Sequence, residues 1–257
     1  MKRLDILFIA LVFTFLCKTA SAQTTDSTQN LTNFSGSVGI TTNGFSIIPS
    51  FSLNSPAFIS RLSWRKKRFS FEPDIRIVPD ATKGGLLFWL RYRLIEKKKF
   101  SLRLGVHPAF NLVRKTVIDN GQSRTITEWL RFAAFEVVPN YQFSKNFGAS
   151  IMYLEGHGLQ SFGPKFTNVL FLNTSITNIG LSENVKLHLF PSVFFLYTDG
   201  YRGDYLTLTT TLAHNKIPFS LQSTINQTIK SDVPNNLNFM WNVGVNYNFN
   251  RDLKKVN

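Results

Sequence analysis

Cysteine is almost absent from this chain. The single cysteine among the 257 residues is Cys17, and it lies in an apolar leader. A mature protein without the leader can therefore form no disulfide and offers no thiol for catalysis or metal binding. The four histidines, His107, His157, His188 and His214, are scattered and show no metal-ligand spacing. We therefore expect neither a metal nor a cofactor.

Long apolar runs are also missing. The run at residues 6–16 follows a basic start at Lys2 and precedes the small residues Ala-Ser-Ala at 20–22. This is the pattern of a signal peptide, residues 1–22, cleaved after Ala22. No later run approaches the roughly 18 apolar residues that a spanning helix needs. If the mature chain enters a membrane, it must do so as strands.

Acidic residues are scarce. The chain has 15 Asp and Glu against 29 Lys and Arg, a net charge of +14. Such an excess often indicates a polyanionic partner, either nucleic acid or a phosphate-rich membrane surface. Export argues against nucleic acid. We expect the lipid bilayer and lipopolysaccharide as partners. The dense basic runs at 65–68 and 97–99 would attract anionic lipid headgroups on the periplasmic side, or lipopolysaccharide phosphates if the orientation were reversed.

Strict alternation of apolar and polar residues is what the sequence has in abundance. Residues 100–113, FSLRLGVHPAFNLV, place apolar side chains on every even position through Leu112, with Arg103 and His107 among the odd ones. Successive side chains of a strand point to opposite faces, so this strand has one apolar face and one polar face. The same alternation recurs along most of the chain, in stretches near the ten residues that a tilted transmembrane strand requires.

These stretches predict an all-β, antiparallel transmembrane barrel. We expect twelve strands between residues 45 and 249, with ten strands as the alternative. Residues 23–44 would be a periplasmic or strand-leading segment, although 34–41 also resembles a strand, and residues 250–257 would be a short periplasmic tail. The apolar phase changes near Ala133, where we expect a bulge or a strand that continues beyond the membrane.

The connections provide an independent indication of orientation. Short links alternate with longer ones along the chain, and the longest fall at 113–124 and 227–237. Outer-membrane barrels keep short turns in the periplasm and long loops outside the cell. Both chain ends are therefore expected in the periplasm. Aromatic residues gather at the expected periplasmic strand ends, as in a membrane-interface girdle: Trp64, Phe69, Phe100, Phe143, Phe147, Tyr247 and Phe249.

The last strand carries a recognisable signal. Asn242, Gly244, Tyr247 and Phe249 resemble the C-terminal β-signal of outer-membrane barrel proteins, which implies the barrel-assembly machinery as a partner. One departure is that residues 250–257 follow the final aromatic. The whole chain is similar to the small outer-membrane barrels of Gram-negative, Bacteroidota-type bacteria. This resemblance implies an outer-membrane location and no particular activity.

The polar parity, which would face the lumen, is rich in arginine. The candidate residues are Arg61, Glu72, Asp74, Arg91, Arg93, Arg103, His107 and Arg131. Across their tight turns, Arg61 should lie opposite Glu72 or Asp74, and Arg93 should face Arg103. Such arginines favour either an anion-selective constriction or a lumen closed by hydrated salt bridges.

Three functions follow from this pattern. The first is a narrow passive channel, or porin, with a weak preference for small anions, which passes small solutes. The second is a closed-lumen structural or assembly-partner barrel that acts through loops 113–124 and 227–237. A barrel-embedded hydrolase is the third, because Glu155 and His157 share one strand face. No hydrolase motif accompanies that pair, so we expect no enzyme and no catalytic residues.

Overall fold

The computed structural model describes residues 32–46, 51–119, 122–234 and 236–253. The expected signal peptide and its cleavage site lie outside these residues. None of the described residues belongs to a helix long and apolar enough to cross a bilayer.

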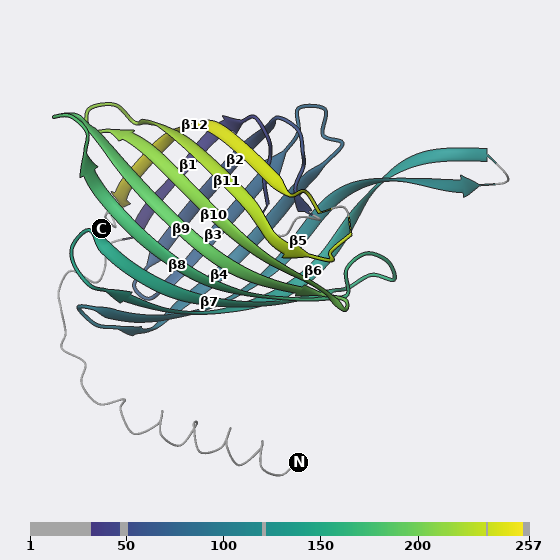
Figure 1. The fold of residues 1–257 in the computed structure, drawn as a ribbon, viewed down its shortest axis with the longest axis horizontal. Helices are drawn as coiled ribbons and strands as arrows, with labels where there is room; N and C mark the ends of the chain where they lie inside the picture. Colours follow the sequence, from purple (N-terminus) through teal and green to yellow (C-terminus); the bar gives the residue numbers. More distant parts are fainter. Residues whose placement is uncertain (1–31, 47–50, 120–121, 235, 254–257) are drawn as a thin grey trace, which may run out of the picture. The chain divides into compact units, whose positions relative to one another are not determined.

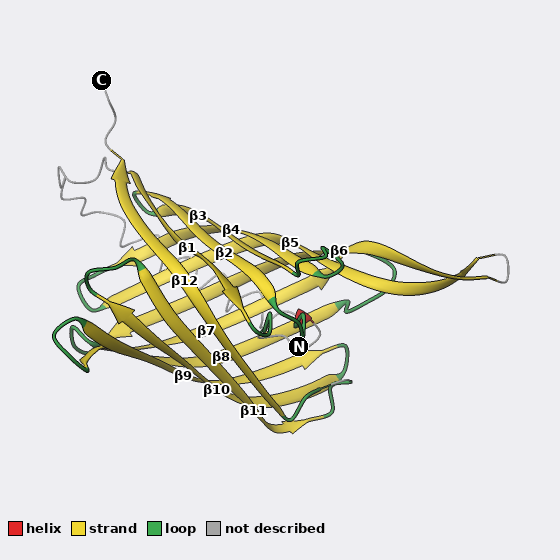
Figure 2. Ribbon diagram, turned by 90° about the horizontal axis from the view of Figure 1, so that it is seen from above, coloured by secondary structure: helices red, strands yellow, loops and turns green. Residues whose placement is uncertain are grey.

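Twelve antiparallel strands form one closed barrel, which confirms the expected fold class and strand number (Figures 1 and 2). Each strand pairs with its neighbours in the sequence, and β1 pairs with β12 to close the ladder. The strands are β1 (Thr32–Thr41), β2 (Ala57–Lys66), β3 (Phe69–Ile77), β4 (Gly84–Glu96), β5 (Phe100–Asp119), β6 (Gln122–Gln142), β7 (Phe147–Gly158), β8 (Phe166–Gly180), β9 (Val185–Thr198), β10 (Tyr201–His214), β11 (Phe219–Ser231) and β12 (Phe239–Leu253).

The position of the first strand differs from the expected one. The barrel begins at residue 32, within the segment that the sequence assigned to a leader of the barrel, and it ends at Leu253 rather than at residue 249. Residues 32–41 form β1 because they are the segment that pairs with both β12 and β2. Phe34, Val38 and Ile40 alternate along β1 and point outward. The expected first strand near Phe45 is not a strand in its described residues.

The segment between β1 and β2 contacts the inner wall, and we use the name inserted segment for its described residues, 42–46 and 51–56. It folds back on itself through backbone hydrogen bonds between Gly44 and both Leu53 and Ser55, each 2.9 Å. Leu53 is buried with Ala57 and Val78. The Phe51 ring lies 5.0 Å from the Phe132 ring of β6, measured between centroids. The segment therefore occupies part of the lumen.

The inserted segment also explains the phase change near Ala133. The pairing of β5 with β6 runs without a register shift from Phe100↔Tyr141 to Asp119↔Gln122. The expected bulge is therefore wrong, whereas the alternative agrees with the structure to the extent that β6 continues beyond the barrel. Leu130 and Phe132 are apolar and buried because they face inward, on the same parity as Glu136.

The two ends of the barrel differ in their connections. One end, the short-turn end, carries the connections at 67–68, 97–99, 143–146, 181–184 and 215–218, and both β1 and β12 have their outer termini there. The other end, the long-loop end, carries the inserted segment and the loop at 232–238. The expected loop at 113–124 is instead a hairpin in which β5 and β6 stay paired beyond the barrel (Figure 1). The connection between β9 and β10 at this end is a tight turn, with positive φ at Asp199 and Gly200.

The outer wall is covered with exposed apolar side chains. They include Phe58, Trp64, Val106, Phe135, Ile151, Leu172, Phe219, Trp241 and Val245. Aromatic pairs gather toward the short-turn end: Phe34 with Phe249, Tyr141 with Phe143, and Phe219 with Tyr247, at 5.0–5.5 Å. An apolar patch of this extent is far larger than a soluble monomer exposes.

Candidate functional site in the barrel lumen

A network of ion pairs lines the inner wall of β2 to β6. At its centre, the Glu136 side chain is fully buried. The Arg91 guanidinium donates to both of its carboxylate oxygens, at 2.7 and 3.2 Å, and also to Glu72. Arg103 Nε lies 3.1 Å from Glu136 Oε1. That Nε is buried and makes no hydrogen bond within the described residues.

A second cluster lies beside the first. Arg76 donates two hydrogen bonds of 2.9 Å to the Asp74 carboxylate, a bidentate geometry that is the strongest form of this pair. A third hydrogen bond of 2.8 Å from Arg76 reaches the carbonyl of Phe45 in the inserted segment. Arg61 Nε is 3.7 Å from Asp74, and its Nη1 is 3.5 Å from Gln222 of β11.

Gly105 of β5 makes room for the buried carboxylate. A Cβ atom at this position would lie 2.7 Å from Glu136 Cγ and 2.9 Å from its Oε1. Real Cβ atoms do not approach other atoms so closely, so a side chain here would displace Glu136. The glycine in the strand therefore marks a close approach and not a turn.

The structure brings most of the sequence-predicted residues onto the inner wall. Arg61 faces Asp74 and Arg93 faces Arg103 across their turns, which confirms both expected registers. Arg93 also pairs with Glu96 of its own strand. Arg131 is a correction: it shares the parity of Trp129 and Phe135 and is exposed on the outer wall. The expectation that it faces the lumen is wrong because the phase change on β6 is not a bulge.

His107 lies within this wall on β5, two turns of the strand pleat from Arg103 toward the long-loop end. Its ring packs against the Trp89 ring, with centroids 3.6 Å apart. The Arg91 guanidinium carbon also lies over the Trp89 ring, 4.2 Å from its centroid. The imidazole is 5 % exposed. Its Nδ1 atom is buried and has no hydrogen-bond partner in the described residues.

Part of the inner wall is apolar, which the alternation pattern of the sequence did not predict. On β8 to β10, the inward side chains form a buried cluster that Val233 of the loop at 232–238 covers: Val169, Phe171, Phe194, Leu196, Tyr205 and Val233. The signal was present in runs such as 193–197 (VFFLY), which are apolar on both parities. Continuous apolar runs indicate strands that are buried on both faces.

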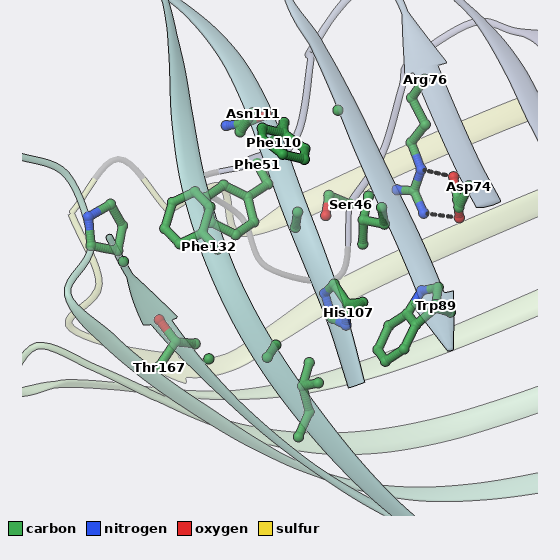
Figure 3. Close-up of a pocket in the computed structure, with 18 of the residues that line it drawn as sticks. Ser46, Phe51, Asp74, Arg76, Trp89, His107, Phe110, Asn111, Phe132 and Thr167 are labelled. Atoms are coloured by element: carbon green, nitrogen blue, oxygen red, sulfur yellow. Dashed lines mark hydrogen bonds and ion pairs between the residues drawn. The ribbon is translucent and has the colours of Figure 1, made fainter. Parts of the chain in front are cut away.

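A cavity of about 270 Å³ lies between the inserted segment and the wall (Figure 3). Its lining comes from β3 to β8 and from Ser46, Phe51 and Leu53 of the inserted segment. Apolar groups dominate this lining, and its polar side chains include Ser46, Asp74, Arg76, Arg91, His107, Asn111 and Thr167. Figure 3 shows the dashed Arg76–Asp74 pair on one side and the Phe51 and Phe132 rings on the other.

The inner wall from β10 to β11 is polar and uncharged. Thr207 donates to Asn226 at 2.7 Å, and Thr209 and Thr224 lie 3.0 Å apart across the same pair of strands. Asn226 is almost completely buried. The ionised side chains of the network are therefore concentrated on one side of the lumen.

The residues of the expected β-signal lie on the closing strand. The side-chain Oδ1 of Asn242 accepts hydrogen bonds from the Thr41 hydroxyl and, at 2.9 Å, from the backbone N–H of Asn43. Gly244 faces Thr41 across the β1–β12 ladder, Tyr247 contacts Phe219, and Phe249 contacts Phe34. This arrangement gives each residue a structural role in closure, while recognition by assembly machinery stays a prediction.

In the described residues, the Glu155–His157 pair considered for catalysis has no serine, threonine or cysteine nucleophile among its side-chain hydrogen-bond partners. Glu155 accepts from Tyr153 and contacts His157 at 2.9 Å, and the His157 side chain is more than half exposed. Ser192 donates to Asn173 at 2.7 Å. Among the described residues, no three His, Cys, Asp or Glu side chains come together as metal ligands.

Comparisons with known proteins show similarity of fold only. No family model matches the sequence, and no curated protein matches it. Among solved structures, the KdgM porin is similar over 84 % of this chain and 99 % of its own, at 11 % identity and a TM-score of 0.46. The CymD monoaromatic hydrocarbon channel is similar over 88 % and 90 %, at 10 % identity and 0.45. An anion-selective porin from Comamonas acidovorans is similar over 87 % and 99 %, at 9 % identity and 0.35.

Proposed function

We propose that this protein is an integral outer-membrane barrel that forms a narrow passive channel with a weak preference for small anions. The observation that carries the anion preference is a pair of arginines whose carboxylate partners are already engaged. Asp74 already pairs with Arg76, and Glu136 already pairs with Arg91. Arg61 and Arg103 therefore share these two carboxylates and have no carboxylate partner of their own in the described residues. Their side chains are 42 % and 35 % exposed to the lumen.

The apolar side chains exposed on the outer wall support the membrane location. A closed barrel satisfies every ladder hydrogen bond internally, which is the condition for strands to cross a bilayer. The outer wall is apolar and bears aromatic groups toward the short-turn end. The ion pairs of the β2–β6 network lie on the inner wall. Lipid outside and charge inside is the arrangement of a transmembrane barrel.

Planar-bilayer recording tests the channel. Folded wild-type protein should give discrete current steps, and a salt gradient should give a reversal potential shifted toward the anion. Arg61→Gln should reduce that shift, because an uncompensated luminal charge is lost. Arg131→Gln is the matched control, because it removes the same charge from the outer wall and should leave the reversal potential unchanged. Equal effects of the two variants would rule out a luminal origin of the preference.

A closed-lumen barrel is the second candidate, and the inserted segment favours it. That segment is tied to the wall by the Arg76–Phe45 hydrogen bond and by the Phe51–Phe132 contact. The β5–β6 hairpin and the loop at 232–238 would then carry the function by contacting a partner. Folded protein that gives no current steps at any voltage would favour this candidate over the channel.

A further inference from the structure

We propose that the cavity behind the inserted segment binds a small, uncharged, largely apolar molecule that carries one hydroxyl group. The proposal does not depend on whether the barrel conducts ions. It rests on three properties of the cavity: its apolar walls, the pairing of its charged groups, and one buried imidazole that lacks a partner.

The walls fit an apolar body. Phe51, Leu87, Phe132, Met152, Leu154 and Phe171 line the space. An apolar cavity of about 150 Å³ in a protein core admits benzene. The larger volume of this cavity, about 270 Å³, has room for one six-membered ring with substituents. Ligand sites of this kind are mostly apolar and contain a few polar groups that fix orientation.

The charges on the lining argue for an uncharged ligand. Arg76 is held by both oxygens of Asp74, and Arg91 is held by both oxygens of Glu136. A charged ligand would have to break one of these pairs and leave a buried ion without its partner, which is strongly unfavourable. A neutral ligand leaves the pairs intact.

His107 supplies the orienting group. Its ring lies on the lining of the cavity, beside Trp89 (Figure 3). Its Nδ1 is buried without a partner in the described residues. An imidazole nitrogen donates or accepts according to the tautomer, and a hydroxyl group can do either. A ligand hydroxyl can therefore satisfy this atom whichever tautomer is present.

Fluorine NMR of the full-length barrel in lipid nanodiscs tests the site, with 4-fluorophenol as the probe and fluorobenzene as the probe without a hydroxyl. Both should show saturable line broadening beyond that in empty nanodiscs, and 4-fluorophenol should bind several-fold more tightly. Partitioning into lipid is not saturable and is removed by the empty-disc reference. No saturable component for 4-fluorophenol would overturn the proposal.

Two variants locate the bound probe. Ala134→Phe places a ring in the cavity and should weaken binding of both probes at least tenfold, whereas Ala133→Phe on the lipid-facing parity of the same strand should not. His107→Leu should bind both probes equally, because the hydrogen-bonding atom is gone. If Ala134→Phe does not fold, as judged by loss of heat-modifiable migration, Ala109→Leu blocks the same cavity from β5. Unchanged binding in the cavity-filling variant, or a retained preference for the phenol in His107→Leu, would contradict the assignment.

Discussion

Glu136 is the residue on which the luminal network depends most. Its carboxylate has no exposed surface, and Arg91 and Arg103 both lie within 3.1 Å of it. Glu136→Gln removes the charge, which leaves Arg91 with Glu72 as its remaining counter-ion and takes away the carboxylate beside Arg103. Breaking a buried pair in this way costs about 3–5 kcal/mol.

We expect this loss as a lower urea midpoint for unfolding in detergent micelles, followed by tryptophan fluorescence, with an unchanged dependence on urea concentration. Glu96→Gln is the control. Glu96 also pairs with an arginine, but its side chain is 46 % exposed, and exposed pairs contribute at most about 1 kcal/mol. Midpoints that shift equally in the two variants would show that burial does not set the strength of the network.

Gly105 gives a second prediction at the residue scale. Gly105→Ala forces a Cβ against Glu136 and should lower the free energy of unfolding by about 1–3 kcal/mol, the usual effect of overpacking. Gly85 also lies on the inner wall, but its Cβ would meet nothing nearer than 3.8 Å. Gly85→Ala should therefore leave the urea midpoint nearly unchanged. An unchanged urea midpoint in Gly105→Ala would mean that Glu136 moves aside at little cost in free energy.

At the scale of elements, the inserted segment should limit the open area of the lumen. Phe51→Ala removes the ring that contacts Phe132, so the segment loses an anchor. We expect larger or more frequent current steps in single-channel recordings. Phe58→Ala removes a ring from the outer wall and should leave the currents unchanged. Currents that are identical in all three proteins would show that the segment does not restrict the path.

The sequence predicts the strands well where one face meets lipid and the other meets charge. The stretch from Phe100 to Leu112 is correct for this reason, because its alternation reflects two different surroundings. Prediction fails where the inner wall is also apolar. On β6, Leu130 and Phe132 resemble a bulge because they are apolar and yet face inward. Phe132 contacts Phe51, which is distant in the sequence, and local periodicity carries no information on such a contact.

At the candidate site, too, contacts fixed by a local turn are predictable from the sequence, and contacts between distant segments are not. The registers of Arg61 with Asp74 and of Arg93 with Arg103 follow from tight turns, which fix pairing locally. The meeting of Glu136 with Arg91 joins residues of β6 and β4 across Gly105 of β5, and it requires the registers of two successive hairpins together. The cavity requires in addition the inserted segment, which the sequence reads as a strand.

At the scale of the whole molecule, the β5–β6 hairpin reports orientation. It extends beyond the barrel at the long-loop end, and Ile118 near its tip is 81 % exposed. If long loops face the cell exterior, trypsin added to intact cells should cut at Lys115 or Arg124. The basic turn at 66–68 should be cut after the outer membrane is broken and not before. Cleavage in the reverse order would invert the assigned orientation.

The pairing of β1 with β12 sets when the protein can become a finished cylinder. Thr32 lies opposite Leu253, and Thr41 lies opposite Gly244, so the seam joins the first and the last strand of the barrel. Until the last strand is in place, two rows of unpaired amide and carbonyl groups stay open to other chains. In the proposed outer-membrane location, insertion would therefore wait for the complete barrel sequence, and those two open edges would have to be kept apart until then.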